Sequence, residues 1–260
     1  MEELQVIKIG GNIIDNEQAL ADFIRKFSAL PGKKILVHGG GKLATRLAEQ
    51  LGVQQQMIDG RRVTDAETLK IVTMVYAGYI NKSIVAALQA HGRNAIGLCG
   101  ADGNIIRAHK RQNAAHNYGY VGDVDRVNTD ELSALLAKHD MLVIAPITHD
   151  GCGQLLNTNA DTIAQELAQA LSTSYDAQLI YCFEKPGVLR DVSDDESCID
   201  CINQASFRQL KEEGVIADGM LPKLDNAFHA LGKGVSAVTI GHAAQLDKLI
   251  SRQSGTTIVL

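Results

Sequence analysis

Strand-like and helix-like segments alternate along nearly the whole chain of 260 residues. A strand that is followed by a helix and a second strand favours parallel pairing, because the helix carries the chain back along the sheet. Parallel sheets are usually covered by helices on both faces. The alternation therefore predicts an α/β fold with a central, mostly parallel sheet.

The boundaries of these elements are predicted from apolar periodicity and from helix start and stop signals. Strands are expected at residues 4–9, 34–38, 95–99, 141–146, 177–182, 235–240 and 256–260. Helices are expected at 16–30, 41–52, 65–88, 129–138, 159–171, 205–213, 219–231 and 243–250. Residues 102–127 hold shorter strand-like pieces between Asn- and Gly-rich turns, which predict antiparallel hairpins at a sheet edge or over a cleft.

The composition narrows the classes of function. A net charge of −5 argues against a nucleic-acid-binding surface, and the absence of Trp argues against a base-stacking platform. No apolar run approaches the length that crosses a bilayer, and the first strand begins too early to leave room for a signal peptide. Five cysteines without such a signal indicate reduced thiols. We therefore expect a cytoplasmic protein that binds neither membranes nor nucleic acids.

The first strand carries a single lysine, Lys8, and ends at Gly10 and Gly11. Removing an ammonium group from water is costly unless an anion meets it. Two glycines let the backbone approach a ligand closely and direct N–H groups toward it. These residues predict a phosphate site. The alternative is an edge strand whose lysine reaches solvent beside an ordinary turn.

A glycine run, Gly39-Gly40-Gly41, lies between the second strand and a helix. The amides at the start of a helix attract anions. A dinucleotide-binding fingerprint is a weaker interpretation, because that fingerprint normally follows the first strand. Arg62 precedes the next helix and suits bidentate capture of a carboxylate, although a solvated basic turn explains it as well.

Two later segments carry polar residues at helix starts. Asn159 and Asp161 are explained by capping of a helix, but Asn157 at the end of the preceding strand is not. Lys223 lies in the first turns of another helix, where the helix dipole disfavours a cation. A bound phosphate would remove that conflict, so Lys223 is a second candidate phosphate ligand.

Taken together and in order, these motifs resemble the amino acid kinase family over essentially the whole chain. The matching segments are Lys8-Ile9-Gly10-Gly11, His38-Gly39-Gly40-Gly41, Arg62-Val63-Thr64, Asn157-Thr158-Asn159-Ala160-Asp161, Asp218-Gly219-Met220 and Lys223. The resemblance implies a three-layer αβα sandwich of the carbamate kinase-like type. An N-terminal lobe, residues 1–172, would bind an N-acyl-glutamate and dimerise, and a C-terminal lobe, residues 173–260, would bind ATP. Both lobes would share one continuous sheet.

Within the family, the motif set is most similar to that of enzymes that phosphorylate the γ-carboxylate of N-acetyl-L-glutamate in arginine biosynthesis. By this resemblance, Lys8 and Lys223 stabilise the transferring phosphoryl group, and Asp161 orients both lysines. Residues implied to bind the acyl-amino acid are Gly40, Gly41, Arg62 and Asn157. Residues implied to contact the nucleotide and its phosphates are Gly10, Gly11, Glu184, Gly187, Val188, Leu189, Ile216, Gly219 and Met220. Mg²⁺ would arrive on the phosphates of ATP, so no metal ligand is assigned to the chain.

The chain departs from the family pattern at a few positions. Glu184 stands where many relatives have aspartate, and by the resemblance it would replace that aspartate in the nucleotide contacts. Lys42 and Arg61 are additional cations near the expected acyl-amino-acid site. They could meet a second carboxylate, as in N-succinyl-L-glutamate, or they could face solvent.

Two further expectations follow from the resemblance. A non-catalytic ligand-binding member of the fold is the remaining alternative, and the presence of Lys8, Asp161 and Lys223 disfavours it. Arginine-inhibited members of the family carry an extra N-terminal helix that joins dimers into hexamers. Because only a few residues precede the first strand, we expect a homodimer that is insensitive to arginine.

Overall fold

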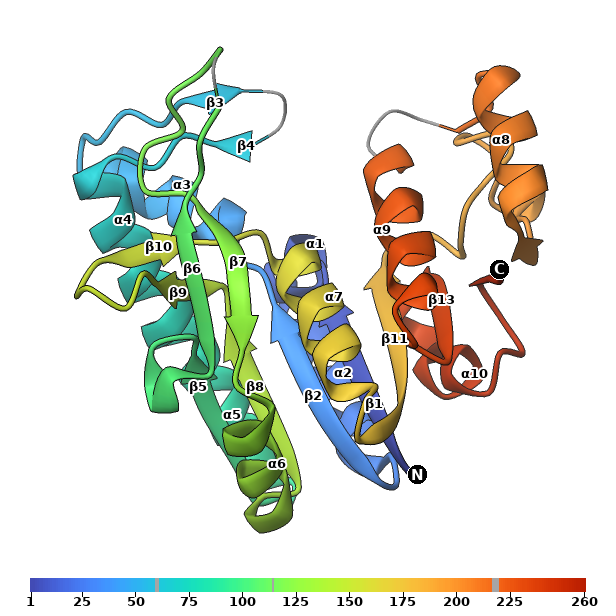
Figure 1. Ribbon diagram of the computed structural model, residues 1–260, viewed down its shortest axis with the longest axis horizontal. Helices are drawn as coiled ribbons and strands as arrows, with labels where there is room; N and C mark the ends of the chain where they lie inside the picture. The colour runs from blue at the N-terminus through green and yellow to red at the C-terminus, as the bar shows by residue number, and fades with distance from the viewer. Residues whose placement is uncertain (59–60, 114, 217–219) are drawn as a thin grey trace. The chain divides into compact units, whose positions relative to one another are not determined.

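The computed structural model describes residues 1–58, 61–113, 115–216 and 220–260. The chain forms two compact units (Figure 1): unit 1 comprises Met1–Ile35 and Ala164–Leu260, and unit 2 comprises Leu36–Ile163. These units differ from the predicted lobes, because the first strand and helix belong with the C-terminal part of the chain. The physical reason is that strand β1 (Glu2–Ile9) pairs along its whole length with strand β11 (Tyr175–Phe183).

The strands of unit 1 lie in the order β12-β14-β13-β11-β1. The further strands are β12 (Cys201–Ile202), β13 (Ala237–His242) and β14 (Thr256–Ile258). Neighbouring strands are parallel except for β13 and β14, which are antiparallel. The α/β class and the mostly parallel sheet are thus confirmed. Residues 4–9 of β1 are all buried, including the polar Gln5 and the charged Lys8, as expected for a strand that is covered on both faces.

Helices surround these strands in unit 1. They are α1 (Gly11–Ile14), α2 (Glu17–Ala29), α8 (Gln204–Glu212), α9 (Leu221–Gly232), α10 (Leu246–Ile250) and the short 3₁₀ turns η3 (Asp195–Ser197) and η4 (Ala243–Gln245). Helix α2 begins where Asn16 accepts a hydrogen bond from the Ala19 N–H, and its apolar face buries the stacked rings of Phe23 and Phe27.

Strand β2 (Lys33–His38) leads from unit 1 into unit 2, and helix α7 (Ala160–Leu171) leads back. In unit 2, β5 (Ala95–Cys99) pairs in parallel with β8 (Met141–Ala145). The predicted hairpins are present as a second sheet in the order β10-β9-β6-β7. Its strands are β6 (Ile106–Lys110), β7 (Gly122–Val127), β9 (Ile147–His149) and β10 (Leu155–Asn157).

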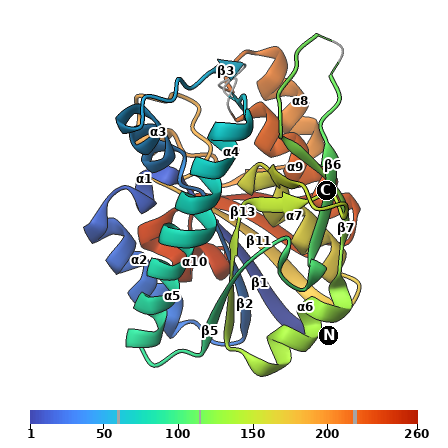
Figure 2. The ribbon, with the colours of Figure 1, turned by 90° about the vertical axis from the view of Figure 1, so that its left-hand side faces the viewer.

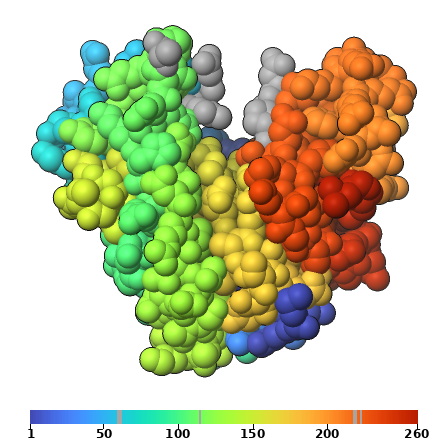
Figure 3. Space-filling model, in the orientation of Figure 1, coloured from blue at the N-terminus to red at the C-terminus, as the bar shows by residue number. Residues whose placement is uncertain are grey.

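The remaining elements of unit 2 lie around these sheets. They are α3 (Gly41–Gln50), β3 (Met57–Ile58), β4 (Arg61–Arg62), α4 (Ala66–Thr73), the π-helical segment η1 (Met74–Ile80), α5 (Asn81–Ala90), the turn η2 (Asp102–Asn104) and α6 (Thr129–Lys138). Strands β3 and β4 form a small antiparallel hairpin. Helix α6 and the β6–β7 hairpin, which are green in Figure 3, lie at the surface of unit 2.

Segments α4, η1 and α5 form one helical run, Ala66–Ala90, which Figure 2 shows end to end. Contrary to the sequence-based expectation, this run is long and apolar enough by length and composition to cross a membrane, with a mean hydropathy of 1.4 over its most apolar window. Its side chains Leu69, Val72, Ile84 and Leu88 are buried. They pack at helical spacing into unit 2, which is the pattern of a core helix.

Candidate active site

Lys8 and Lys223 lie over the same aromatic ring in unit 1. The Nζ atom of Lys8 is 5.7 Å from the centroid of the Phe183 ring, and the Nζ atom of Lys223 is 4.4 Å from it. Lys8 projects from a buried strand and is 8% exposed, whereas Lys223 lies in the first turn of α9. The two Nζ atoms are therefore at most 10.1 Å apart, and an anion bound by both would offset their mutual repulsion.

The glycines that follow Lys8 differ in what their N–H groups can do. The N–H of Gly10 donates to the carbonyl oxygen of Cys182 at 3.2 Å. It extends the β1–β11 ladder, so this N–H is already used and does not match the predicted phosphate contact. Gly11 begins α1, and the first N–H groups of a helix have no acceptor within the helix. Of the two predicted backbone donors, Gly11 is the better candidate.

The segment that follows β11 carries four of the nine predicted nucleotide contacts. Glu184 accepts a hydrogen bond from the side chain of Asn12, and both line a cavity of about 520 Å³ at the carboxyl ends of β1, β11 and β13. Gly187 is required by packing, because a Cβ atom there would lie 2.6 Å from the Thr256 hydroxyl. The N–H of Val188 donates to that hydroxyl at 2.8 Å.

The other predicted nucleotide residues have mixed positions. Val188, Leu189 and Ile216 are buried, which also suits a purely structural role. Met220 is the residue at which α9 begins. Gly219 lies outside the described residues. No contact in the structure assigns a nucleotide to this segment, so these residues remain predictions.

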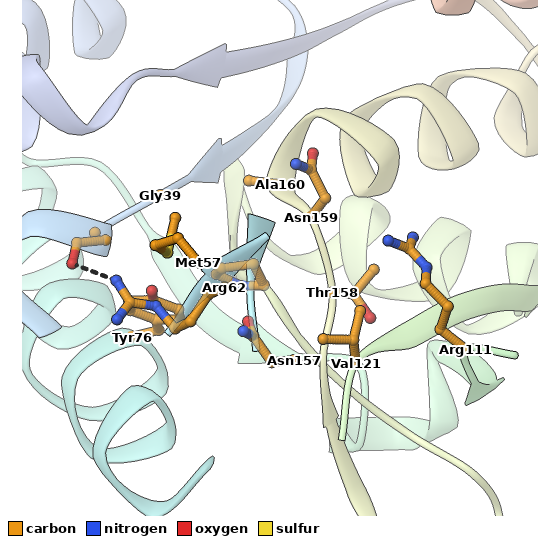
Figure 4. A pocket seen from close by; sticks show the side chains of 13 residues that line it. Gly39, Met57, Arg62, Tyr76, Arg111, Val121, Asn157, Thr158, Asn159 and Ala160 are labelled. Atoms are coloured by element: carbon orange, nitrogen blue, oxygen red, sulfur yellow. Dashed lines mark hydrogen bonds between the residues drawn. The ribbon is translucent and has the colours of Figure 1, made fainter. Parts of the chain in front are cut away.

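A pocket of about 240 Å³ in unit 2 brings together all four residues that were predicted to bind the acyl-amino acid (Figure 4). Its lining consists of Gly39, Gly40, Gly41, Met57, Arg62, Tyr76, Arg111, Val121, Pro146, Asn157, Thr158, Asn159 and Ala160. The glycine turn, the β3–β4 hairpin and the segment before α7 are far apart in the sequence. Their convergence places backbone amides, a guanidinium group and a carboxamide around one space.

Arg62 is fixed against the glycine turn. Its Nη2 group donates to the carbonyl oxygen of Gly41 at 2.9 Å and to the hydroxyl of Thr45 at 2.8 Å. Its Nη1 group donates to the side chain of Gln55. These bonds hold a permanent positive charge at the pocket wall, and such a charge is suited to bind a carboxylate.

The glycine turn is fixed by packing against Ile80 and by a hydrogen bond from His38. Gly40 has φ 149°, and a Cβ atom there would lie 2.3 Å from Cδ1 of Ile80, so no larger residue fits. The Nδ1 atom of buried His38 is 2.8 Å from the carbonyl oxygen of Gly39. Its Nε2 atom is 3.2 Å from Nδ2 of Asn81, which also donates to the carbonyl oxygen of Val143 at 3.0 Å.

These bonds determine the protonation state of His38. The carbonyl oxygen of Val143 can only accept, so Nδ2 of Asn81 is a donor and Nε2 of His38 must accept. The histidine is therefore neutral, with its proton on Nδ1. Burial lowers the pKa of His38 to about 4, and the nearby charge of Lys82 acts in the same direction.

The segment before α7 is fixed by its own hydrogen bonds. The carboxamide of Asn157 donates to the hydroxyl of Thr64 at 3.0 Å. The Asn159 side chain accepts from the N–H groups of Asp161 and Thr162, so it caps α7, as the structural alternative had suggested. Asp161 directly follows Ala160, which lines the pocket. Its orientation of the two lysines remains a prediction.

The sequence analysis missed two polar residues of the pocket, Tyr76 and Arg111. Tyr76 lies within the helix expected at residues 65–88, and no motif marked it as a binding residue. Arg111 follows β6, and its Nε group donates to Asp123 at 3.0 Å and 3.1 Å. The predicted hairpin over a cleft was a signal for Arg111, but no motif marked the residue. Of the two cations proposed to meet a second carboxylate, Lys42 is exposed, and the side chain of Arg61 lies outside the described part of the structure.

Comparison with known proteins finds relatives that match almost the whole chain. Acetylglutamate kinase from Bacteroides fragilis is 56% identical over 257 residues, which cover 99% of this chain and 97% of that protein. Acetylglutamate kinase from Cytophaga hutchinsonii is 54% identical over 262 residues and covers 100% of this chain and 99% of its own. Both matches run essentially from end to end.

Solved structures share the fold. The crystal structure of smu.665 from Streptococcus mutans has a TM-score of 0.81 and 27% identity, covering 100% of this chain and 99% of its own. Carbamate kinase from Giardia has a TM-score of 0.73 at 13% identity over 99% and 98% of the two chains, which confirms the carbamate kinase-like fold. The model of the amino acid kinase family matches residues 3–242. The chain therefore belongs to the amino acid kinase family.

Proposed function

We propose that this protein uses ATP to phosphorylate the γ-carboxylate of N-acetyl-L-glutamate, forming N-acetyl-L-glutamyl 5-phosphate for arginine biosynthesis. The observation that carries the proposal is the convergence of Gly40, Gly41, Arg62 and Asn157 on one pocket. The names of the relatives from B. fragilis and C. hutchinsonii support the same substrate. We assign the acyl-amino acid to this pocket in unit 2 and ATP to unit 1.

In the pocket, Arg62 takes the α-carboxylate of the substrate, because a guanidinium group binds a planar anion through parallel hydrogen bonds. The carboxamide of Asn157 supplies a further donor to the same group. Gly40 and Gly41 let the acyl-amino acid lie against the backbone at the start of α3.

Phosphoryl transfer to a carboxylate needs no general base, because the nucleophile is already ionised near neutral pH. Both reactants are anions, so catalysis depends on positioning and on neutralisation of charge. We assign this neutralisation to Lys8 and Lys223, with Asp161 orienting them and Gly11 adding a backbone donor. Mg²⁺ enters on the phosphates of ATP.

We also assign the nucleotide to the segment from Glu184 to Leu189 and to the start of α9 near Ile216 and Met220. This segment follows the carboxyl end of β11, and ligands of open parallel sheets bind at that end of the strands. Gly187 keeps the loop close to β14, where its contact with Thr256 leaves no room for a side chain.

A second candidate substrate is N-succinyl-L-glutamate, and Arg111 is the observation that favours it. Arg111 lines the same pocket as Arg62, so two cations face one small space. Its bonds to Asp123 use the Nε and Nη2 groups and not Nη1. A carboxylate at the acyl end of the substrate would meet that remaining group.

ADP release in a coupled assay should occur with N-acetyl-L-glutamate and not with glutamate, aspartate, carbamate or UMP. N-succinyl-L-glutamate in the same panel decides between the two acyl groups. A higher kcat/KM with the succinyl compound, lost on Arg111→Gln while acetyl turnover persists, would select the second candidate. Turnover of UMP or carbamate alone, with neither acyl-glutamate accepted, would overturn the proposed function.

We further propose a cytoplasmic homodimer. The helical run of unit 2 exposes Met74 (55%) and Tyr79 (69%) on the face that points away from the core, and an apolar helix face of this kind suits a second copy of the chain. Sedimentation velocity at micromolar concentration should give a dimer that Tyr79→Glu shifts toward monomer. A monomeric wild-type protein under these conditions would contradict the proposal.

A further inference from the structure

Tyr76 occupies an unusual position in the helical run of unit 2. It lies in the π-helical segment η1, between α4 and α5, and such segments occur frequently at functional sites. The side chain is only 5% exposed, yet it lines the pocket that holds Arg62. Figure 4 shows Tyr76 beside the guanidinium group of Arg62.

The ring of Tyr76 packs directly on the glycine turn. A Cβ atom added to Gly40 would lie 3.1 Å and 3.2 Å from two carbon atoms of this ring. The absence of a side chain at Gly40 therefore lets the ring reach the backbone of the turn. Tyr76 forms the wall of the pocket at the point where the amides of the turn meet Arg62.

The hydroxyl of Tyr76 is close enough to Arg62 for the guanidinium charge to act on it, lowering the pKa of the hydroxyl against the larger effect of burial. A guanidinium group has no acceptor, so the hydrogen of the hydroxyl remains for another acceptor. Burial raises the pKa of Tyr76, so the hydroxyl keeps its proton near neutral pH. An anion bound by Arg62 would lie within the reach of this donor.

We propose that Tyr76 contacts the acyl-amino acid, with its hydroxyl donating a hydrogen bond to the carboxylate that Arg62 binds and its ring closing the pocket beside the glycine turn. This inference rests on the proposed function and adds a specificity-determining residue to it. A hydroxyl beside a guanidinium group selects a carboxylate over a carboxamide, because the amide nitrogen of a carboxamide would oppose one of the two donors.

The test is Tyr76→Phe, which removes the hydroxyl and keeps the ring. Loss of a hydrogen bond to a charged group should raise the KM for N-acetyl-L-glutamate about 10-fold or more, with kcat and the KM for ATP nearly unchanged. Tyr175→Phe is the matched control, because Tyr175 is also buried, at 8% exposed, but lies in unit 1 and does not line the pocket. This control should behave as wild type.

A second ligand separates the hydroxyl from a general effect on folding. The α-carboxamide analogue of N-acetyl-L-glutamate is neutral at this group and keeps only one oxygen acceptor, so Tyr76→Phe should weaken its binding less than that of N-acetyl-L-glutamate in a calorimetric titration. An unchanged KM for N-acetyl-L-glutamate, or equal weakening of both ligands, would overturn the assignment. If wild type binds N-acetyl-L-glutamate but does not phosphorylate it, the proposed function fails, and the same titrations still decide the role of Tyr76.

Discussion

Replacing Lys8 or Lys223 by alanine is expected to lower kcat by about 10²–10³, the usual effect of losing one preorganised donor to a developing charge. Both ammonium groups lie over the ring of Phe183, so each is placed to meet the same migrating phosphoryl group. The KM for N-acetyl-L-glutamate should change little, because its pocket lies in unit 2. Steady-state kinetics of both variants measures these effects.

Lys33→Ala is a matched control for this experiment. Lys33 also lies in unit 1 over an aromatic ring, with its Nζ atom 5.5 Å from the centroid of the Tyr175 ring, but it pairs with Glu2. Its replacement should leave kcat unchanged. If Lys8 and Lys223 act on the same phosphoryl group, kcat of the variant that carries both alanine substitutions should fall by less than the product of the two single-variant factors. A loss confined to KM in the single variants would argue against a transition-state role.

Acidification is expected to destabilise the protein through His38. The pKa of His38 is about 4 in the folded protein against an ordinary value of 6.5, so between these values the unfolded chain binds more protons. The free energy of unfolding should therefore fall as the pH drops from about 6.5 to about 4. Relative to neutral pH, His38 should lower the free energy of unfolding by about 2 kcal/mol at pH 5 and by about 3 kcal/mol once the pH is below its folded-state pKa.

Urea unfolding of wild type and His38→Gln between pH 7 and pH 4.5 measures this contribution. Carboxylates titrate in both proteins. A difference between the two proteins in the slope of the free energy of unfolding against pH is therefore due to the histidine, even if the variant is less stable at every pH. His91→Gln is the control, because His91 is exposed at the end of α5. It should keep the wild-type slope. Parallel curves for wild type and His38→Gln would show that the histidine does not titrate as its burial requires.

The fold was largely predictable from the sequence, because each main strand has its own apolar run and each helix its own start signal. Asp65 illustrates this, since its side chain accepts a hydrogen bond from the N–H of Thr68 and caps α4 at the expected start of that helix. The predicted boundary near residue 172 differs from the observed units. The N-terminal strand β1 pairs with β11 and so belongs to the same unit as the C-terminal part of the chain. Pairing between strands so distant in the chain leaves no local signal.

Very short strands, and the direction of the last strand, were not predicted from the sequence. Strands β9 and β12 have three and two residues, too few for an alternating pattern to be recognised. Strand β14 runs antiparallel to β13, although a helical segment separates them. That segment, α10, has only five residues and is followed by a reversal at Gly255, which has φ 78°.

Site residues could be predicted from the sequence where their residue type is unusual for the local secondary structure. A lysine in a buried strand and a glycine run before a helix both conflict with structural expectation, so they indicated function. Tyr76 conflicts with nothing, because an aromatic ring suits the apolar face of a helix. Only the structure shows that Tyr76 and Arg111 line the same pocket as Arg62.

The most direct test of the paired lysines is a crystal structure with ADP, aluminium fluoride and N-acetyl-L-glutamate, in which the fluoride group mimics the phosphoryl group in transfer. We expect the Nζ atoms of both Lys8 and Lys223 within about 3 Å of fluoride atoms. The γ-carboxylate should face the aluminium in line with ADP, and Arg62 should hold the α-carboxylate. A fluoride group bound away from either lysine, or an acyl-amino acid bound outside the Arg62 pocket, would contradict the proposed chemistry.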